Sequence, residues 1–201
     1  MKGLYIVTPD WDETEKLVVA TEAALKGGAA LVQYRHKTAS PELRKEQAGK
    51  LLALCRQYNR PLIINDHIEL ALELGAEGIH VGGTDASVAE ARKRVGPGMI
   101  VGASCYDSLD RARMSHEAGA SYIAFGGFYP SRVKKYDFKT PYDIVTRAKE
   151  QIPLPVVVIG GMTPDNAVPL IEAGTDMVAA ISAVYMTDDP QASAQAFIER
   201  F

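Results

Sequence analysis

Short apolar runs recur along the chain, and polar side chains follow each of them closely. The runs are apolar at nearly every position instead of alternating with polar residues. This pattern is typical of parallel β-strands that are covered on both faces. We therefore expect strands in the following segments: 4–7, 29–32, 62–64, 79–81, 100–103, 123–125, 156–159 and a last run that ends before Ile181.

The segments between these runs have helical patterns with recognisable starts and ends. A hydroxyl side chain precedes proline at Ser40, Thr140 and Thr163, which is typical of a helix N-cap. A glycine that suits the left-handed residue after a helix recurs at Gly28, Gly75, Gly119 and Gly174, each followed closely by a strand. The helices are expected at 13–26, 41–57, 67–74, 86–95, 108–118, 141–151, 164–173 and 189–200.

Four copies of this helix–glycine–strand repeat imply eight βα units. We predict an α/β fold, a single (β/α)8 TIM barrel with parallel strands, over residues 1–201. A doubly wound open sheet is the alternative. It is disfavoured because no Gly-x-Gly-x-x-Gly follows the first run, and polar candidates follow nearly every strand instead of one switch point.

Composition narrows the class of protein. With 201 residues the chain is short for such a barrel, so most of its loops must be short. The long basic loop at 126–139 is the exception, and we interpret it as a candidate lid over the barrel mouth. A net charge of −3 argues against nucleic-acid binding. The N-terminal apolar run is too short for a signal peptide or a membrane anchor, and Cys55 and Cys105 lack zinc or disulfide spacing. A cytoplasmic protein is expected, and a homo-oligomer is compatible with the sequence.

Two aspartates follow neighbouring predicted strands, Asp66 after the third and Asp85 after the fourth. In a barrel their carboxylates would lie close together at the carboxyl ends of the strands. Mg²⁺ is commonly held by one or two carboxylates together with substrate phosphates. Each aspartate alone is better explained as a helix cap, but together and near cations they predict a magnesium site.

Cationic side chains and backbone N–H groups at glycines are the remaining candidates for substrate binding. Arg35, Lys37 and Lys134 would share the mouth and suit a diphosphate, although ordinary surface charge explains most such residues. Gly160-Gly161 after the seventh strand and Ile181-Ser182 after the eighth lie where barrels of this kind bind phosphate. His80 is expected to fill the barrel core, and we assign no histidine a catalytic role.

The sequence also resembles the thiamine-phosphate synthase family, through short motifs that occur in the same order. They are Gln33-Tyr34-Arg35-His36-Lys37, Ile64-Asn65-Asp66, Gly78 to Asp85, Gly102-Ala103-Ser104, Tyr129 to Lys134, Ile159-Gly160-Gly161 and Ile181-Ser182-Ala183. The likeness runs from about residue 4 to residue 190.

The resemblance implies a transferase that joins 4-amino-2-methyl-5-pyrimidinylmethyl diphosphate to 4-methyl-5-hydroxyethylthiazole phosphate, with Mg²⁺ as cofactor. It implies catalytic roles for Arg35, Lys37, Ser104 and Lys134, and metal binding by Asp66 and Asp85. By the same resemblance, the residues that hold the pyrimidine diphosphate are Gln33, Arg35, Lys37, Asn65, Ser104 and Lys134, and those that hold the thiazole phosphate are Ser131, Val133, Gly161, Ile181 and Ser182. Tyr34 and His36, which lie in the first motif, are also expected to bind substrate.

Several positions differ from the family pattern. Tyr34 replaces a leucine, Gly83 a glutamine, Val133 a threonine, and Tyr106 a common histidine. Two alternatives stay open. One is a thiazole tautomerase of the same family, which relies on a histidine where Tyr106 stands, and the other is a non-catalytic binder of thiazole or thiamine phosphate.

Overall fold

The computed structural model describes residues 1–82, 87–131 and 137–201. Its eight strands are all parallel and close into a barrel in sequence order, with β1 paired to both β2 and β8. The strands are β1 (Gly3–Val7), β2 (Leu31–Tyr34), β3 (Leu62–Asn65), β4 (Gly78–Val81), β5 (Ile100–Tyr106), β6 (Tyr122–Gly126), β7 (Val156–Ile159) and β8 (Met177–Ala180). The predicted TIM barrel is confirmed.

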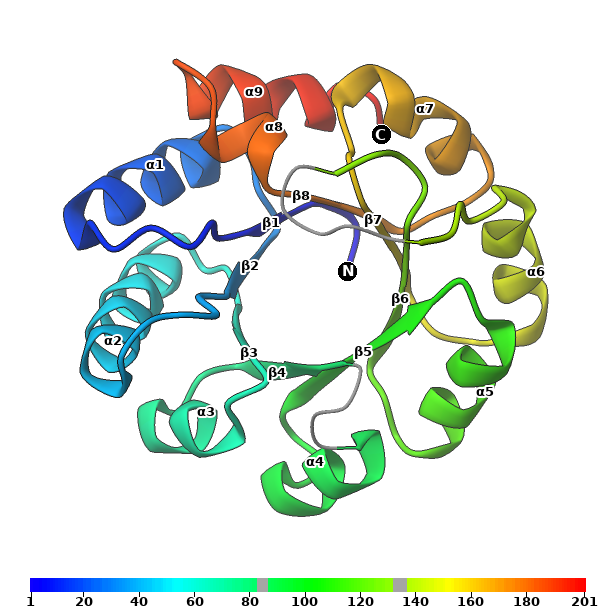
Figure 1. Cartoon of the computed structure of the whole chain (residues 1–201), viewed down its shortest axis with the longest axis horizontal. Coiled ribbons are helices and arrows are strands. Elements are labelled where there is room, and N and C mark those ends of the chain that lie inside the picture. Colours follow the sequence, from blue (N-terminus) through cyan, green and yellow to red (C-terminus); the bar gives the residue numbers. More distant parts are fainter. Residues whose placement is uncertain (83–86, 132–136) are drawn as a thin grey trace.

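Helices form an outer ring around the strands (Figure 1). They are α1 (Thr14–Lys26), α2 (Pro41–Gln57), α3 (Ile68–Leu74), α4 (Val88–Val95), α5 (Leu109–Glu117), α6 (Asp143–Gln151), α7 (Pro164–Glu172), α8 (Ser182–Tyr185) and α9 (Pro190–Ile198). The eight predicted helices are present with ends shifted by at most two residues, and the short α8 was not predicted. In the described part of the chain, none of these helices has the length and apolar content needed to cross a membrane.

Local signals explain most helix ends. Ser40 accepts a hydrogen bond from the Leu43 amide, and Thr163 forms a reciprocal capping box with Asn166. The prediction that Thr140 caps a helix was wrong. Its buried hydroxyl donates instead to the carbonyl of Gly126 at the end of β6, and α6 begins only at Asp143. The four glycines expected after helices, Gly28, Gly75, Gly119 and Gly174, all have positive φ, as at Gly75 (64°).

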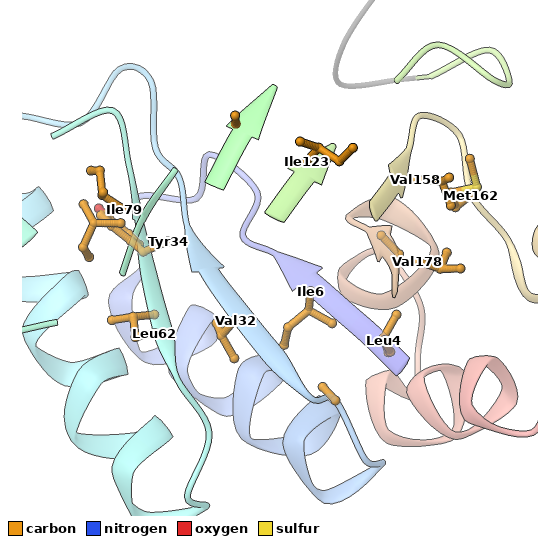
Figure 2. Packing of buried hydrophobic residues seen from close by; sticks show 14 of the residues in the cluster. Leu4, Ile6, Val32, Tyr34, Leu62, Ile79, Ile123, Val158, Met162 and Val178 are labelled. Carbon is orange, nitrogen blue, oxygen red and sulfur yellow. The ribbon is translucent and has the colours of Figure 1, made fainter. Parts of the chain in front are cut away.

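Side chains alternate along each strand between two apolar layers. Leu4 and Ile6 of β1 point outward and pack between the strands and the helices (Figure 2), whereas Tyr5 and Val7 point into the barrel. The interior layer also contains Leu31, Ile63, Tyr122, Ala124, Val157, Met177 and Ala179. This alternation determines which residues near the strand ends can face the barrel mouth.

Candidate active site

A cavity of about 390 Å³ lies over the barrel interior, at the carboxyl ends of the strands. Eight of the predicted substrate-contact residues line it: Gln33, Arg35, Asn65, Ser104, Ser131, Gly161, Ile181 and Ser182. These residues come from segments up to 149 positions apart (33 to 182). The structure therefore brings most of the described candidates to one place, the end of the fold where TIM barrels carry out chemistry.

Tyr34 and His36 lie outside this cavity. Because Gln33 points inward, its neighbour Tyr34 must point outward, and its hydroxyl donates to Gln47 of α2 at 2.9 Å. His36 is buried, and its Nε2 lies 3.1 Å from the Asp12 carboxylate. The structure therefore places both side chains away from the cavity, Tyr34 against Gln47 of α2 and His36 against Asp12 in the loop after β1.

The loop after β2 is held by a carboxylate that the sequence analysis missed. Asp10, which follows β1, lies 3.3 Å from the Arg35 guanidinium and accepts the Lys37 backbone N–H at 3.0 Å. Thr8 adds a pair of hydrogen bonds to the Arg35 backbone, each below 3.0 Å. These contacts position the Arg35 side chain at the cavity before any ligand is bound.

Asp66 lies beside the cavity in a left-handed backbone conformation with φ of 63°. Its Oδ2 accepts from Lys37 Nζ at 2.7 Å and from Asn65 Nδ2 at 2.6 Å. The N-cap of α3 is His67 and makes no side-chain cap, so Asp66 does not serve the capping role that was its simpler explanation. A non-glycine residue held in this conformation is typical of functional sites.

Asp66 fits one ligand position of a magnesium ion, because its carboxylate is only 14% exposed and lies among groups that bind anions. Asp85, the second predicted ligand, lies outside the described residues, as do Val133 and Lys134. Within the described ranges, no cluster of three or more His, Cys, Asp or Glu side chains could hold a metal ion.

Ser104 projects from β5 into the cavity, and its Oγ lies 2.8 Å from His80 Nε2. Gly82 makes room for this contact, since a β-carbon there would come within 2.8 Å of the same oxygen. His80 does lie in the barrel interior as expected, but it also lines the cavity. Its Nδ1 continues to the hydroxyl of Tyr122 at 2.9 Å, a partner that the apolar sequence around β6 did not suggest.

The glycines after β7 form the opposite wall of the cavity. Gly161 has φ of 63°, and a β-carbon there would lie 2.3 Å from the Pro130 carbonyl oxygen. Its own carbonyl accepts from Asn166 Nδ2 of α7 at 2.9 Å, which fixes the turn at the start of that helix. Backbone N–H groups that no side chain covers, beside the N-terminus of α7, suit an anionic group such as a phosphate.

The family model for "Thiamine monophosphate synthase" matches residues 4–184, which is most of the chain. The chain belongs to this family. Among curated members it is 60% identical to the thiamine-phosphate synthase of Janthinobacterium sp. strain Marseille, over all of this chain and 97% of that protein. It is 48% identical to the thiamine-phosphate synthase of Thiobacillus denitrificans, over 96% and 91% of the two chains.

A solved structure agrees with this family assignment. The chain matches thiamine phosphate pyrophosphorylase from Pyrococcus furiosus with a TM-score of 0.88 and 30% identity, covering 98% of this chain and 94% of that one.

Tyr106, which departs from the family pattern, follows a register shift between β5 and β6 and has the Arg111 guanidinium 5.3 Å from its ring centroid. As far as the described residues define it, the cavity wall does not include Tyr106.

Proposed function

We propose that the protein joins 4-amino-2-methyl-5-pyrimidinylmethyl diphosphate to 4-methyl-5-hydroxyethylthiazole phosphate in this cavity. The reaction releases pyrophosphate and forms thiamine phosphate. This is the reaction expected of a thiamine-phosphate synthase, a transferase. The observation that carries the proposal is that one cavity has a polar wall at Gln33, Asn65 and Ser104 and an opposite wall of bare backbone at Gly160-Gly161. Two phosphorylated substrates can therefore meet across it.

In this proposal the polar wall binds the pyrimidine diphosphate. Arg35 and Ser104 line the cavity, and Lys37 contacts Asp66 beside it. The C–O bond to the diphosphate breaks, and negative charge grows on the departing pyrophosphate. Donors fixed in place before the reaction stabilise such charge, each by roughly 10²–10³ in rate. Lys134, known only from the sequence, is proposed to join them.

The opposite wall binds the thiazole phosphate through Gly161, Ser131, Ile181 and Ser182. The thiazole nitrogen then captures the pyrimidinylmethyl cation left by bond cleavage. That nitrogen already has a lone pair, so the bond-forming step requires no general base. This agrees with a cavity whose one histidine among the lining residues, His80, is engaged with Ser104 and Tyr122.

Asp66 and Asp85 are proposed to hold Mg²⁺, which when bound would neutralise charge on the diphosphate. The support is the position of Asp66 beside Lys37 and Asn65 and the absence of a helix-capping role for its side chain. A biosynthetic enzyme of this kind, with small phosphorylated substrates, is proposed to act in the cytoplasm.

The test is an assay with both substrates, with each alone and without Mg²⁺. A synthase releases pyrophosphate only when both substrates and the metal are present. A thiazole tautomerase would instead convert a thiazole carboxylate phosphate without releasing pyrophosphate. A non-catalytic binder would retain thiamine phosphate tightly without turnover, and either of these two results would contradict the proposal.

A further inference from the structure

A continuous chain of hydrogen bonds crosses the barrel interior beneath the cavity. Gln33 Nε2 lies 2.6 Å from the Tyr5 hydroxyl, which lies 2.7 Å from the Tyr122 hydroxyl. Tyr122 reaches His80 Nδ1 at 2.9 Å, and His80 Nε2 reaches Ser104 Oγ at 2.8 Å. The two ends of the chain, Gln33 and Ser104, line the cavity on β2 and β5.

We propose that Tyr5, Tyr122 and His80 form a polarised relay that fixes Gln33 as a hydrogen-bond acceptor and Ser104 as a donor toward the ligand. The three are positioning residues in this proposal. They act on the reaction through the orientation of Gln33 and Ser104.

The proton count of the two phenols makes the hydrogen bonds of the relay run in a single direction from one end to the other. Tyr5 and Tyr122 are almost fully buried, and burial raises the pKa of both, so each keeps its proton at neutral pH. Each hydroxyl therefore donates one hydrogen bond and accepts at least one. If Gln33 donates its N–H to Tyr5, then Tyr5 donates to Tyr122 and Tyr122 donates to His80 Nδ1.

His80 is then the Nε2–H tautomer and donates to Ser104 Oγ. The Ser104 hydroxyl proton is left to point at a ligand, and the Gln33 carbonyl oxygen is left to accept from one. The reverse direction would make Ser104 donate to His80 and turn it into an acceptor, which suits an anion poorly. The Gln33 amide is oriented with Nε2 toward the Tyr5 hydroxyl at 2.6 Å, which corresponds to the forward direction.

The barrel is built to accommodate this relay. A β-carbon at Gly102 would lie 2.1 Å from the Tyr122 ring and 2.6 Å from His80 Nδ1, so glycine is needed for their contact. The Tyr5 and Tyr122 rings meet edge to face, with centroids 5.9 Å apart. Tyr122 stacks on His80 with an interplanar angle of 24°. Buried polar chains of this kind hold their members in one arrangement when every hydrogen bond is made.

The inference rests on the proposed function for the identity of the ligand. It predicts a ligand with a donor, such as an exocyclic amino group on a heteroaromatic ring, facing Gln33. It also predicts an anionic oxygen facing Ser104. A single relay would then link recognition of the ring to stabilisation of the leaving group.

The first test is independent of activity. Nitrogen-15 NMR of the histidine side chains in the ligand-free protein should show His80 as the neutral Nε2–H tautomer, with its signals assigned by their loss in His80→Gln. Tyr122→Phe should shift the Nδ1 resonance because that nitrogen loses its donor. A neutral Nδ1–H tautomer, an imidazolium or no response to Tyr122→Phe would overturn the proposal.

The second test uses kinetics. Tyr122→Phe should lower kcat by about tenfold, the usual effect of one hydrogen bond, with a much smaller change in KM for the thiazole phosphate. The matched control is Tyr185→Phe, which removes another buried phenol hydroxyl, bonded to Thr21 at 3.0 Å and outside the barrel interior. In a Ser104→Ala background the effect of Tyr122→Phe should shrink to the part that acts through Gln33.

Equal effects of the two tyrosine variants, or an undiminished effect of Tyr122→Phe in the Ser104→Ala background, would contradict the relay. Failure of the proposed function is distinguishable from failure of the relay. A protein without transferase activity would contradict the function, whereas an active enzyme with the wrong His80 tautomer would contradict the relay alone.

Discussion

Asp10 and Arg35 form an ion pair at the cavity, with Asp10 Oδ1 3.3 Å from Arg35 Nη1. The same carboxylate oxygen accepts the Lys37 backbone N–H at 3.0 Å. Asp10 therefore has two separable effects. It holds the loop after β2 in place, and it partly neutralises a cation that is proposed to bind diphosphate.

These effects should separate in two variants of Asp10. Asp10→Asn keeps an oxygen for the Lys37 N–H but removes the negative charge, so pyrophosphate should inhibit about two- to fivefold more strongly, the scale of a partly exposed ion pair. Asp10→Ala also loses the loop contact and should raise KM for the diphosphate substrate. Inhibition constants and KM values measured at fixed ionic strength check this, and identical behaviour of the two variants would contradict it.

Asp66→Asn should raise the Mg²⁺ concentration needed for half-maximal activity by about tenfold or more, because an amide binds Mg²⁺ less strongly than a carboxylate does. Asp85→Asn should act in the same direction. Asp165→Asn is the control, since Asp165 pairs with Arg200 on the surface. Magnesium titrations of the three variants provide the measurement, and an unchanged requirement in Asp66→Asn would remove it from the metal site.

Gly161→Ala should raise KM for the thiazole phosphate by at least about tenfold. The added β-carbon would meet the Pro130 carbonyl at 2.3 Å, and the left-handed backbone at φ 63° disfavours alanine. Gly98→Ala is the matched control because nothing lies within 4 Å of its β-carbon position. If both variants bind the thiazole phosphate equally well, the glycine wall is not its site.

The two cysteines should be inert in the native protein. Both are buried and unbridged, and burial raises the pKa of Cys55 to about 12 and that of Cys105 to about 11 from an ordinary value of 9.0. Native protein at pH 8 should therefore react with a thiol reagent far more slowly than unfolded protein. A fast native reaction would show that at least one thiol is accessible.

The same thiols predict a loss of stability at alkaline pH. Above pH 9 the unfolded chain releases thiol protons that the native state keeps, so the free energy of unfolding falls as pH rises. Each thiol contributes up to about 1.4 kcal/mol per pH unit in this range. Urea unfolding at several pH values between 8 and 10.5 provides the measurement, and stability that rises over this range would contradict it.

Much of this architecture could be predicted from local sequence. The apolar runs and the glycines after the helices indicated the barrel, and polar residues after the strands indicated its mouth. The alternation of side chains along a strand predicts one point that the motif resemblance does not. Gln33 and Tyr34 are adjacent, so their two side chains cannot both face the cavity. Tyr34 stands inside the motif, but its side chain packs outward and its hydroxyl donates to Gln47 of α2.

Contacts across the barrel could not be predicted in this way. Tyr5 and Tyr122 are 117 positions apart and lie within apolar strands, where an aromatic residue usually only packs. Their meeting depends on the register of the closed barrel and on the space left by Gly102. Asp10 was missed for a related reason, since its partners lie on the loop of the next strand.

The most direct test of the account is a crystal structure of the protein with pyrophosphate and Mg²⁺. We expect the pyrophosphate oxygens within hydrogen-bond distance of Ser104 Oγ and the Arg35 guanidinium, with the metal ion bound to Asp66. Pyrophosphate bound only at Gly160-Gly161, with no ligand or metal near Ser104 and Asp66, would contradict the assignment of the two walls.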